Sequence, residues 1–487
     1  MPTIAFDALD YRADQTFAAA RYRFSGDERT GWRVERDGAP VLQLGPGFRL
    51  LRVRQCGVCS TDLARHHLPF PLPQVIGHEV VALDADGRRY TVEINASHRA
   101  RGIATDCPFC RADLPTHCPE RTTLGIHDLP GGFGAWILAP IAGCIEVPRN
   151  VPDAAAVLVE PFAAALHAVQ TVAPRAGEHI AVLGPRRLGM LVVAALAAVR
   201  KRAAGTHGNF TIAAVARDPQ LLALARTFGA DTVHQVGADH PVPTAAFDVV
   251  IDTTGNPTGL DLAVRMARRE VHLKSTHGQS AGGLRHTTEL VVDEIGIARF
   301  PAAAPTAGAA PWERLRTGHR PRIAWLAATA PPAWLPAHVD VQRGDAAALA
   351  AHFAAATDGL PRADVAVAED AAGIDAAIRP IAGSEVALVR PRGEVLVLPG
   401  SPLSADLAAA PLLAAIAGRG LRLTSSRCGD FHAALQLLAG DAELRRIGER
   451  LVSHHFAAAE LRQAFVTARS PGCIKAVVDQ PESPGVV

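Results

Sequence analysis

Residues 179–189 decide the fold, and they read His-Ile-Ala-Val-Leu-Gly-Pro-Arg-Arg-Leu-Gly. The run up to Leu183 has the apolar character and the length of a buried strand, and Gly184 to Gly189 reads as a turn. An Ala- and Leu-rich stretch from Met190 to Ala198 continues as a helix. A solid apolar strand joined to a helix by a glycine turn is typical of a parallel sheet covered on both faces by helices.

The same alternation continues towards the C-terminus. Further strands are predicted at 211–215, 247–251 and 271–275, and a helix is predicted at 219–228. The segment 153–300 is therefore predicted to form a doubly wound α/β domain with a parallel sheet.

A second α/β segment follows a Pro/Ala/Gly-rich stretch at 301–311 that has the composition of a linker. The order strand, loop, helix, strand in 270–298 recurs with similar spacing in 394–425. We interpret 312–426 as a partial second copy of the α/β half, within an inserted domain spanning 301–426. Alanine-rich composition alone could also produce this likeness.

The N-terminal part of the chain has a different texture. Residues 1–152 combine short β-like runs, such as 48–54 and 79–83, with Gly and Pro turns. This texture predicts a mostly-β domain.

Composition excludes several classes of function. The 487 residues carry a formal net charge of +1, so no electrostatic argument favours nucleic acid or a membrane as a partner. No apolar run of about 18 residues is present, and the first residues do not read as a secretory signal. Most of the eight cysteines fall into two clusters with metal-like spacing, which indicates a reducing compartment. We expect a cytoplasmic protein.

Three candidate zinc ligands come from distant stretches. Cys59 ends a Cys-x-x-Cys pair, His78 stands in Gly-His-Glu, and Glu160 precedes a proline. A thiolate, an imidazole and a carboxylate make three protein ligands, and a catalytic zinc keeps its fourth position for water or substrate. A buried thiol beside a hydrogen-bonded histidine is the alternative, and Cys-x-x-Cys also occurs in zinc ribbons and redox pairs.

Neighbouring residues suit supporting roles around such a metal. Asp62 could hold the histidine ring nitrogen that does not face the zinc. Thr61 could pass a proton between the substrate and solvent. Glu79, directly after the histidine, is a further candidate catalytic group.

A second cysteine cluster comprises Cys107, Cys110 and Cys118. A closed structural zinc site needs four ligands, and His98, Asp106 or His117 could complete the set. Three thiols without a metal are the alternative.

The turn at 184–189 is an altered dinucleotide fingerprint. Gly184 and Gly189 are retained, but Arg186 replaces the middle glycine that lets the backbone approach a pyrophosphate. A helix N-terminus still offers N–H groups to a phosphate, and Arg186 or Arg187 could add positive charge. An α/β domain that has lost its cofactor is the alternative.

The end of the strand at 211–215 bears on the choice between NADP and NAD. Ala216 occupies the position where an acid would bind the adenosine ribose, and Arg217 follows it. This pattern favours the 2′-phosphate of NADP, whereas Asp218 could serve NAD. Further candidate cofactor contacts follow the next strands: Thr254, Gly255, Ser275 and Thr276.

Together these motifs resemble the medium-chain zinc-dependent alcohol dehydrogenases, which include the threonine and polyol dehydrogenases. The match covers Cys56–Asp62, Gly77–Glu79, the second cysteine cluster, Gly132–Trp136, Glu160-Pro161, the glycine turn and Ser426–Asp430. The resemblance implies a mostly-β, GroES-like catalytic domain split around a Rossmann domain, with its N-terminal part at 1–152 and a return to it at 427–487. It also implies that Cys59, His78 and Glu160 hold the catalytic zinc and that Thr61 stands in a proton relay. Ala104 stands where the first cysteine of the second cluster belongs.

The expected function is zinc-dependent hydride transfer between a small alcohol or carbonyl substrate and NADP or NAD. The alternative is a non-catalytic, zinc-stabilised scaffold with a decayed nucleotide site. The chain is expected to be a monomer or a homodimer. The inserted half-copy is expected to stand in for a partner subunit by covering the edge of the sheet.

Overall fold

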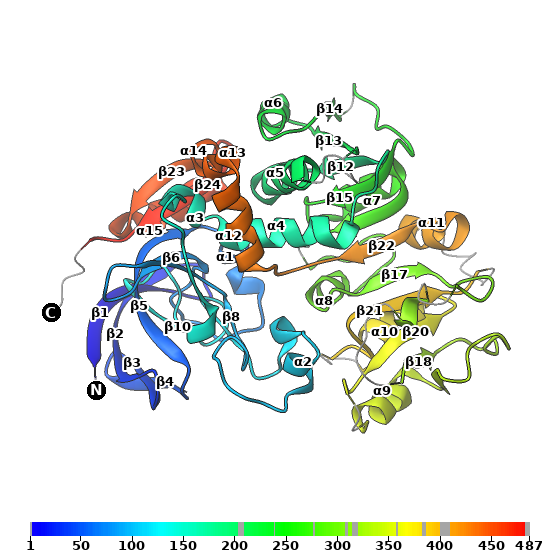
Figure 1. The fold of residues 1–487 in the computed structure, drawn as a ribbon, viewed down its shortest axis with the longest axis horizontal. Coiled ribbons are helices and arrows are strands. Elements are labelled where there is room, and N and C mark those ends of the chain that lie inside the picture. Colours follow the sequence, from blue (N-terminus) through cyan, green and yellow to red (C-terminus); the bar gives the residue numbers. More distant parts are fainter. Residues whose placement is uncertain are drawn as a thin grey trace. The chain divides into compact units, whose positions relative to one another are not determined.

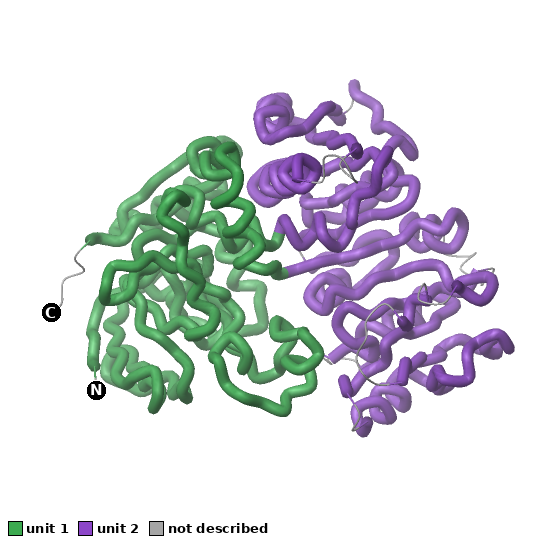
Figure 2. Tube along the Cα trace, viewed as in Figure 1, with its two compact units in different colours: residues 1–164, 428–487 green, residues 165–427 purple. Residues whose placement is uncertain are grey.

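The computed structural model describes residues 2–202, 209–237, 239–275, 278–306, 310–313, 320–356, 359–381, 386–399 and 410–482. These residues form two compact units (Figure 2). Unit 1 comprises Met1–Ala164 and Cys428–Val487, and unit 2 comprises Ala165–Arg427. The chain therefore leaves unit 1 once and returns to it near its end. The predicted second copy lies in the same unit as the first.

Unit 1 is mostly β (Figure 1). A four-stranded antiparallel sheet contains β1 (Thr3–Tyr11), β2 (Phe17–Asp27), β3 (Gly31–Arg36) and β4 (Ala39–Leu44). A seven-stranded sheet has the order β11-β7-β6-β5-β24-β23, and β10 also pairs with β5. Its strands are β5 (Phe48–Gly57), β6 (Glu79–Leu83), β7 (Arg89–Val92), β10 (Trp136–Pro140), β11 (Cys144–Glu146), β23 (Val452–Ala457) and β24 (Lys475–Asp479). Strands β8 (Asn95–Ala96) and β9 (Thr122–Thr123) pair separately.

The C-terminal return is built into the larger sheet of unit 1. β24 pairs antiparallel with β5, so a strand from the end of the chain lies beside the strand that leads into Cys56. The helices of this unit are α1 (Ser60–Leu63), α2 (Pro108–Arg111), α3 (Asp153–Ala156), α12 (Phe431–Gly440), α13 (Ala442–Arg445), α14 (Ile447–Leu451) and α15 (Leu461–Arg469). Helix α4 (Val159–Val172) begins in unit 1 and continues past its boundary at Ala164.

Unit 2 contains one eleven-stranded sheet with the order β14-β13-β12-β15-β16-β22-β17-β21-β20-β18-β19. Its strands are β12 (His179–Leu183), β13 (Thr211–Ala216), β14 (Thr232–Gln235), β15 (Phe247–Asp252), β16 (Ala267–Leu273), β17 (Gly296–Arg299), β18 (Arg322–Trp325), β19 (Asp340–Arg343), β20 (Ala363–Ala368), β21 (Val389–Val397) and β22 (Arg422–Ser425). All neighbours are parallel except β17 and β22, which pair antiparallel.

Helices connect the parallel strands, as such sheets require. They are α5 (Arg187–Arg202), α6 (Pro219–Thr227), α7 (Pro257–Met266), α8 (Thr287–Val292), α9 (Ala346–Ala354), α10 (Ala371–Ile378) and α11 (Pro411–Arg419). Several begin at a side-chain cap: Asp218 accepts a hydrogen bond from the backbone N–H of Gln220, and Asn256 accepts one from Gly259. One apolar core is shared by strands and helices from both ends of this sheet.

The predicted fold class is confirmed: a mostly-β unit accompanies a largely parallel α/β sheet. The strands predicted at 79–83 and 179–183 have those bounds. Two elements begin earlier in the structure than the sequence predicts. Helix α5 begins at Arg187 rather than Met190, and β16 begins at Ala267 rather than Val271.

Among the described residues, no helix has both the length and the apolar character needed to cross a bilayer.

Candidate functional site

Unit 1 contains a compact group of metal-ligand side chains formed by His98, Cys107, Cys110 and Cys118. Their donor atoms all lie within 4.8 Å of one another. The Sγ atoms of Cys107 and Cys118 are 3.9 Å apart. Nδ1 of His98 is 3.3 Å from Sγ of Cys118 and 3.8 Å from Sγ of Cys110.

These separations match the edges of a zinc coordination tetrahedron. Bonds of about 2.3 Å to sulfur and about 2.0 Å to nitrogen at a tetrahedral centre give S···S and S···N edges of roughly 3.5 to 3.8 Å. The other ring nitrogen of His98 lies 3.1 Å from Oε2 of Glu120, the kind of carboxylate contact that orients a metal-binding imidazole. The donor set and its geometry therefore fit a structural zinc.

The fourth member of this cluster is His98. His98, Asp106 and His117 are the three candidates for this position, and the structure brings His98 to the three thiols. The backbone N–H of Ile103 donates to the carbonyl of His98, which closes a turn ahead of the cysteine loop. Ala104 lies in the position of the absent cysteine, and the histidine reaches the cluster from outside that motif.

Two thiols of this cluster, Cys110 and Cys118, have raised pKa values. Burial raises the pKa of Cys118 to about 12, and the neighbouring thiols Cys110 and Cys107 add to the effect. Burial also raises the pKa of Cys110. A cation among these sulfur atoms would remove the repulsion between thiolates, because metal binding favours the deprotonated form.

A second set of predicted residues gathers at α1 and the start of β6. Cys59 is the N-cap of α1, and its backbone N–H donates to Oδ2 of Asp62 at 2.8 Å. Oδ1 of the same carboxylate lies 3.3 Å from Nδ1 of His78. Asp62 thus contacts the histidine ring through Nδ1, and its role in orienting a zinc-bound His78 stays a prediction.

The groups around His78 favour the positively charged form of its imidazole. Burial lowers the pKa of His78, but Asp62 and Cys59 outweigh it and hold that pKa well above its ordinary value. Burial raises the pKa of Cys56 well above its usual range, which fits a packing role for that thiol.

Glu79 lies in an ion pair that sequence analysis missed. Its carboxylate contacts Nζ of Lys475, and both side chains are almost fully buried. Nζ also donates to the carbonyl of Val58 at 3.1 Å. No local signal could have found this pair, because the lysine lies on β24 near the other end of the chain.

Glu160 lies near the start of α4, in the same electrostatic environment. Burial raises its pKa to about 7, with His78 and Lys475 acting to lower it and Glu79 acting to raise it. Among the described residues, the His98 cluster is the one group of three or more donors within 4.8 Å, so Cys59, His78 and Glu160 do not meet that closely. Their joint ligation of one zinc stays a prediction.

In unit 2 the predicted glycine turn follows β12. Gly184 has a φ of +78°, and a Cβ at this position would lie 2.7 Å from Cγ2 of Thr254. A Cβ on Gly189 would lie 2.7 Å from Oγ1 of Thr253. The first and last glycines of the fingerprint are therefore required by close packing of the turn against the end of β15.

The middle position does not interrupt the turn. The backbone N–H of Arg186 donates to the carbonyl of Gly184, and the carbonyl of Arg186 accepts the first hydrogen bond of α5. Arg186 and Arg187 therefore lie at a helix N-terminus, where backbone N–H groups can bind a phosphate.

The end of β15 is tied to the same turn. Oγ1 of Thr253 donates to the carbonyls of Leu183 and Gly184 at 2.9 Å. Thr254 donates twice to Oδ1 of Asp252, from its N–H and its hydroxyl. Burial raises the pKa of Asp252 to about 6, against the lowering effect of these two hydrogen bonds.

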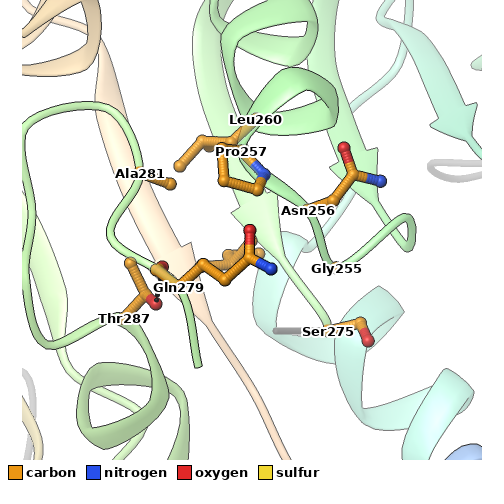
Figure 3. A pocket seen from close by; sticks show the side chains of 9 residues that line it. Gly255, Asn256, Pro257, Leu260, Ser275, Gln279, Ala281 and Thr287 are labelled. Carbon is orange, nitrogen blue, oxygen red and sulfur yellow. Dashed lines mark hydrogen bonds between the residues drawn. The ribbon is translucent and has the colours of Figure 1, made fainter. Parts of the chain in front are cut away.

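Two predicted cofactor contacts, Gly255 and Ser275, line one small pocket at the carboxyl ends of β15 and β16 (Figure 3). Asn256, Pro257, Gln279 and Thr287 line it with them. Parallel sheets bind ligands at this edge. Thr276, also predicted, lies outside the described residues.

The end of β13 carries Arg217 in an exposed position. Asp218 caps α6, because its Oδ1 accepts from the N–H of Gln220 at 2.8 Å. The carboxylate that could serve an adenosine ribose is thus engaged in stabilising the helix.

The site residues can now be compared with known proteins. Residues 45–149 match the family described as the alcohol dehydrogenase GroES-like domain. The chain is 28% identical over 244 residues to an L-threonine 3-dehydrogenase of Rhizobium rhizogenes, which covers 47% of this chain and 64% of that protein. The chain thus spans slightly less than two thirds of the length of this relative.

Solved structures share the fold. L-idonate 5-dehydrogenase of Escherichia coli superposes with a TM-score of 0.57 at 13% identity, covering 98% of this chain and 99% of that one. An alcohol dehydrogenase of Thermotoga maritima gives 0.54 at 14% identity, covering 98% and 100%. Residues 45–149 thus belong to the alcohol dehydrogenase GroES-like domain family, and with the α/β sheet that accompanies them the chain is similar to the medium-chain zinc alcohol dehydrogenases.

Proposed function

We propose that this protein is a zinc-dependent oxidoreductase that transfers a hydride between an alcohol or carbonyl substrate and a nicotinamide nucleotide, with NADP(H) as the preferred form. The observation that carries the proposal is the buried contact between Asp62 and Nδ1 of His78 beside Cys59. This arrangement presents an oriented imidazole and a thiol together, which is the donor chemistry of a catalytic zinc.

Cys59, His78 and Glu160 would hold the metal. A zinc ion held there would supply Lewis-acid chemistry, polarising the substrate oxygen and lowering the pKa of the alcohol. Asp62 fixes the ring of His78 through Nδ1, and the Lys475 ammonium balances the buried Glu79 charge nearby. Thr61 stands in α1 two residues after Cys59 and would pass the substrate proton towards solvent.

The nucleotide would bind at the carboxyl edge of the unit 2 sheet. The bound nicotinamide would supply the acceptor or donor of the hydride. The N-terminus of α5 would take the pyrophosphate, and Gly255 and Ser275 would contact the nicotinamide end. The exposed Arg217, beside an Asp218 engaged in capping α6, supports recognition of a 2′-phosphate and hence NADP over NAD.

The test combines metal analysis, nucleotide binding and turnover. Purified protein is titrated with NADPH and NADH by nicotinamide fluorescence, and zinc is measured per chain. L-Threonine is the first substrate to assay with NADP, because the relative quoted above is an L-threonine 3-dehydrogenase. Cys59→Ala should lose one zinc and all turnover, whereas Cys144→Ala, outside both clusters, should lose neither.

The scaffold alternative makes the opposite forecast. If neither nucleotide binds to zinc-replete protein, the nucleotide site has decayed and the proposed activity is wrong.

A further inference from the structure

The sheet of unit 2 has the strand order of two half-sheets meeting at the antiparallel pair β22 and β17. From β22 outwards the order is β16, β15, β12, β13, β14. From β17 outwards it is β21, β20, β18, β19. If β12 and β18 are each counted as the first strand of a half, the two orders agree position by position, with the third strand absent from the second half. An antiparallel junction between two parallel half-sheets is the pattern of a two-fold axis.

The two central strands lie on the wrong sides of this axis. The chain runs from β16 through α8 to β17, yet β17 pairs in parallel with β21 of the second half. It runs from β21 through α11 to β22, yet β22 pairs in parallel with β16 of the first half. In the count that starts at β12 and at β18, β16 and β21 are the fifth strands and β17 and β22 are the sixth strands. Each sixth strand therefore lies beside the fifth strand of the other half (Figure 1).

Equivalent polar contacts support the correspondence between the halves. In the first half, the N–H of His179 at the start of β12 donates to Oδ2 of Asp248, the second residue of β15, at 2.8 Å. In the second half, the N–H of Arg322 at the start of β18 donates to Oδ2 of Asp364, the second residue of β20, also at 2.8 Å.

The irregularities of the two halves also coincide. The register between β15 and β16 shifts between Phe247 and Val249, and the register between β20 and β21 shifts between Ala363 and Val365. In α7 the cap accepts from Gly259, three residues on, and in α10 the cap Asp370 accepts from Gly373, also three residues on. Alanine-rich composition cannot produce shared bulges and caps, because those depend on particular residues.

Buried polar groups tie β22 to β16. Oγ1 of Thr424 donates to Oε1 of Glu270 at 2.7 Å. The ring nitrogens of His272 lie 2.9 Å from the hydroxyls of Thr424 and Ser426. Nζ of Lys274 donates to Oγ of Ser426 at 3.0 Å. A one-residue slip of β22 would leave these buried groups without partners, so the ladder sets its register.

Ion pairs also connect β21 with β22 and with a residue just before β17. Arg422 of β22 lies 2.7 Å from Oε1 of Glu394 on β21. Arg392 of β21 lies 2.7 Å from Oε2 of Glu294, just before β17. The charges on the two halves are thus complementary where the halves meet.

The segment between β18 and β19 differs from its counterpart between β12 and β13. Residues 326–339 contain turns and no helix, whereas α5 follows β12 in the first half. Aromatic rings pack together here: those of Phe300 and Trp325 are 5.5 Å apart, and those of Trp312 and Trp334 are 6.4 Å apart. This described segment therefore lacks the helix N-terminus that could bind a phosphate in the first half.

We propose that residues 320–425 are a built-in partner for the nucleotide-binding half. The two are copies of one α/β half related by two-fold pseudosymmetry, and they have exchanged their sixth strands. The edge of β16, where a sheet could otherwise extend into another molecule, is occupied by β22 of the same chain. The proposal goes beyond the activity proposed above and does not depend on it.

A designed disulfide tests the exchange in the full-length chain. Val271 of β16 and Leu423 of β22 are direct register partners in the parallel pair. Neighbouring strands lie about 4.7 to 4.9 Å apart, within reach of a disulfide. After mild oxidation, Val271→Cys/Leu423→Cys should give a 271–423 crosslink within a chain of monomer mass, identified by peptide mapping. Without the exchange β17 would lie beside β16, so Val271→Cys/Ile297→Cys is the matched control and should give no crosslink.

Two results would overturn the proposal: a covalent dimer linked through these positions, or folded protein without the crosslink. Both substituted side chains are fully buried, so a second measurement uses the unmodified protein. Amide hydrogen exchange should protect 296–299 and 422–425 as strongly as 180–183, at every protein concentration. Rapid exchange in either strand, or protection that falls on dilution, would contradict an exchange within one chain.

Discussion

Glu79 and Lys475 form a buried ion pair although 396 positions separate them in sequence. The glutamate begins β6 and the lysine begins β24, two strands that flank β5 on either side. The C-terminal return of the chain therefore supplies the counter-charge for the carboxylate that follows His78.

Removing the lysine should be costly. Lys475→Met leaves the Glu79 carboxylate buried without its partner, which typically lowers the free energy of unfolding by about 3 to 5 kcal/mol. Glu79→Gln/Lys475→Met should recover most of that loss, because no unpaired charge remains. Urea denaturation measures both. The exposed pair Arg446–Glu449 is the control, and Arg446→Met should cost less than about 1 kcal/mol. Equal losses for the two single variants would contradict the interpretation.

His98 should decide whether the cysteine cluster retains metal. His98→Ala should lower the zinc content by one atom per chain, and His98→Cys should restore it, since either donor completes the tetrahedron. Glu120→Gln should weaken zinc binding by roughly 10- to 100-fold through loss of the carboxylate contact. His117→Ala, in the same loop but outside the cluster, should leave the zinc content unchanged. Elemental analysis checks each variant, and full zinc in His98→Ala would exclude this ligand set.

Arg217 should strengthen the binding of NADPH but not that of NADH. Loss of a charge-assisted hydrogen bond costs about 1.5 to 3 kcal/mol, so Arg217→Ala should weaken NADPH binding by roughly 10- to 150-fold. NADH lacks the 2′-phosphate, and its dissociation constant should not change. Arg226→Ala is the matched control, because Arg226 lies on α6 and its guanidinium contacts the carbonyl of Asp231 beyond the end of that helix. An equal effect on both nucleotides would assign Arg217 a different role.

Asp252 should make stability depend on pH. Its pKa is raised to about 6 by burial, and its Oδ2 lacks a hydrogen-bond partner among the described residues. In the unfolded chain the carboxyl ionises near pH 3.9. The folded state therefore holds the proton more tightly, and the protein loses stability as the pH rises from about 4 to about 6. At pH 7 the loss amounts to roughly 2 to 3 kcal/mol.

Asp252→Asn removes this ionisation and keeps an oxygen that can accept from Thr254. The variant should match the parent near pH 4 and exceed it by the stated amount at pH 7. Denaturation curves at several pH values test this, and a difference that does not vary with pH would contradict it.

Local patterns predicted the individual elements well. The strand at 179–183 is an unbroken apolar run ended by a glycine with positive φ, so both of its ends are marked in the sequence. β16 was placed too late, because Ala267-Arg-Arg-Glu270 carries three charges and reads as a loop. Those residues form a strand because Glu270 is paired with Arg269 and Thr424 inside the protein.

Long-range choices lay beyond the sequence. His98, Asp106 and His117 offered equivalent chemistry, and only the path of the loop brings the first of them to the thiols. The exchange of β17 and β22 leaves no local trace either. A parallel strand has the same apolar pattern whichever neighbour it pairs with, so the sequence could indicate a repeat without indicating how its halves are joined.

The exchanged strands bear on how the chain can be made. β16 ends at Leu273, and its neighbour β22 begins only at Arg422. At a translation rate of about 5 to 20 residues per second, the ribosome needs on the order of ten seconds to deliver the strand that completes the first half. During that interval the nascent polypeptide exposes an unpaired strand, the kind of surface that chaperones recognise. The pairing of β22, the last strand of this sheet to be synthesised, is therefore the step that commits both halves to their native state.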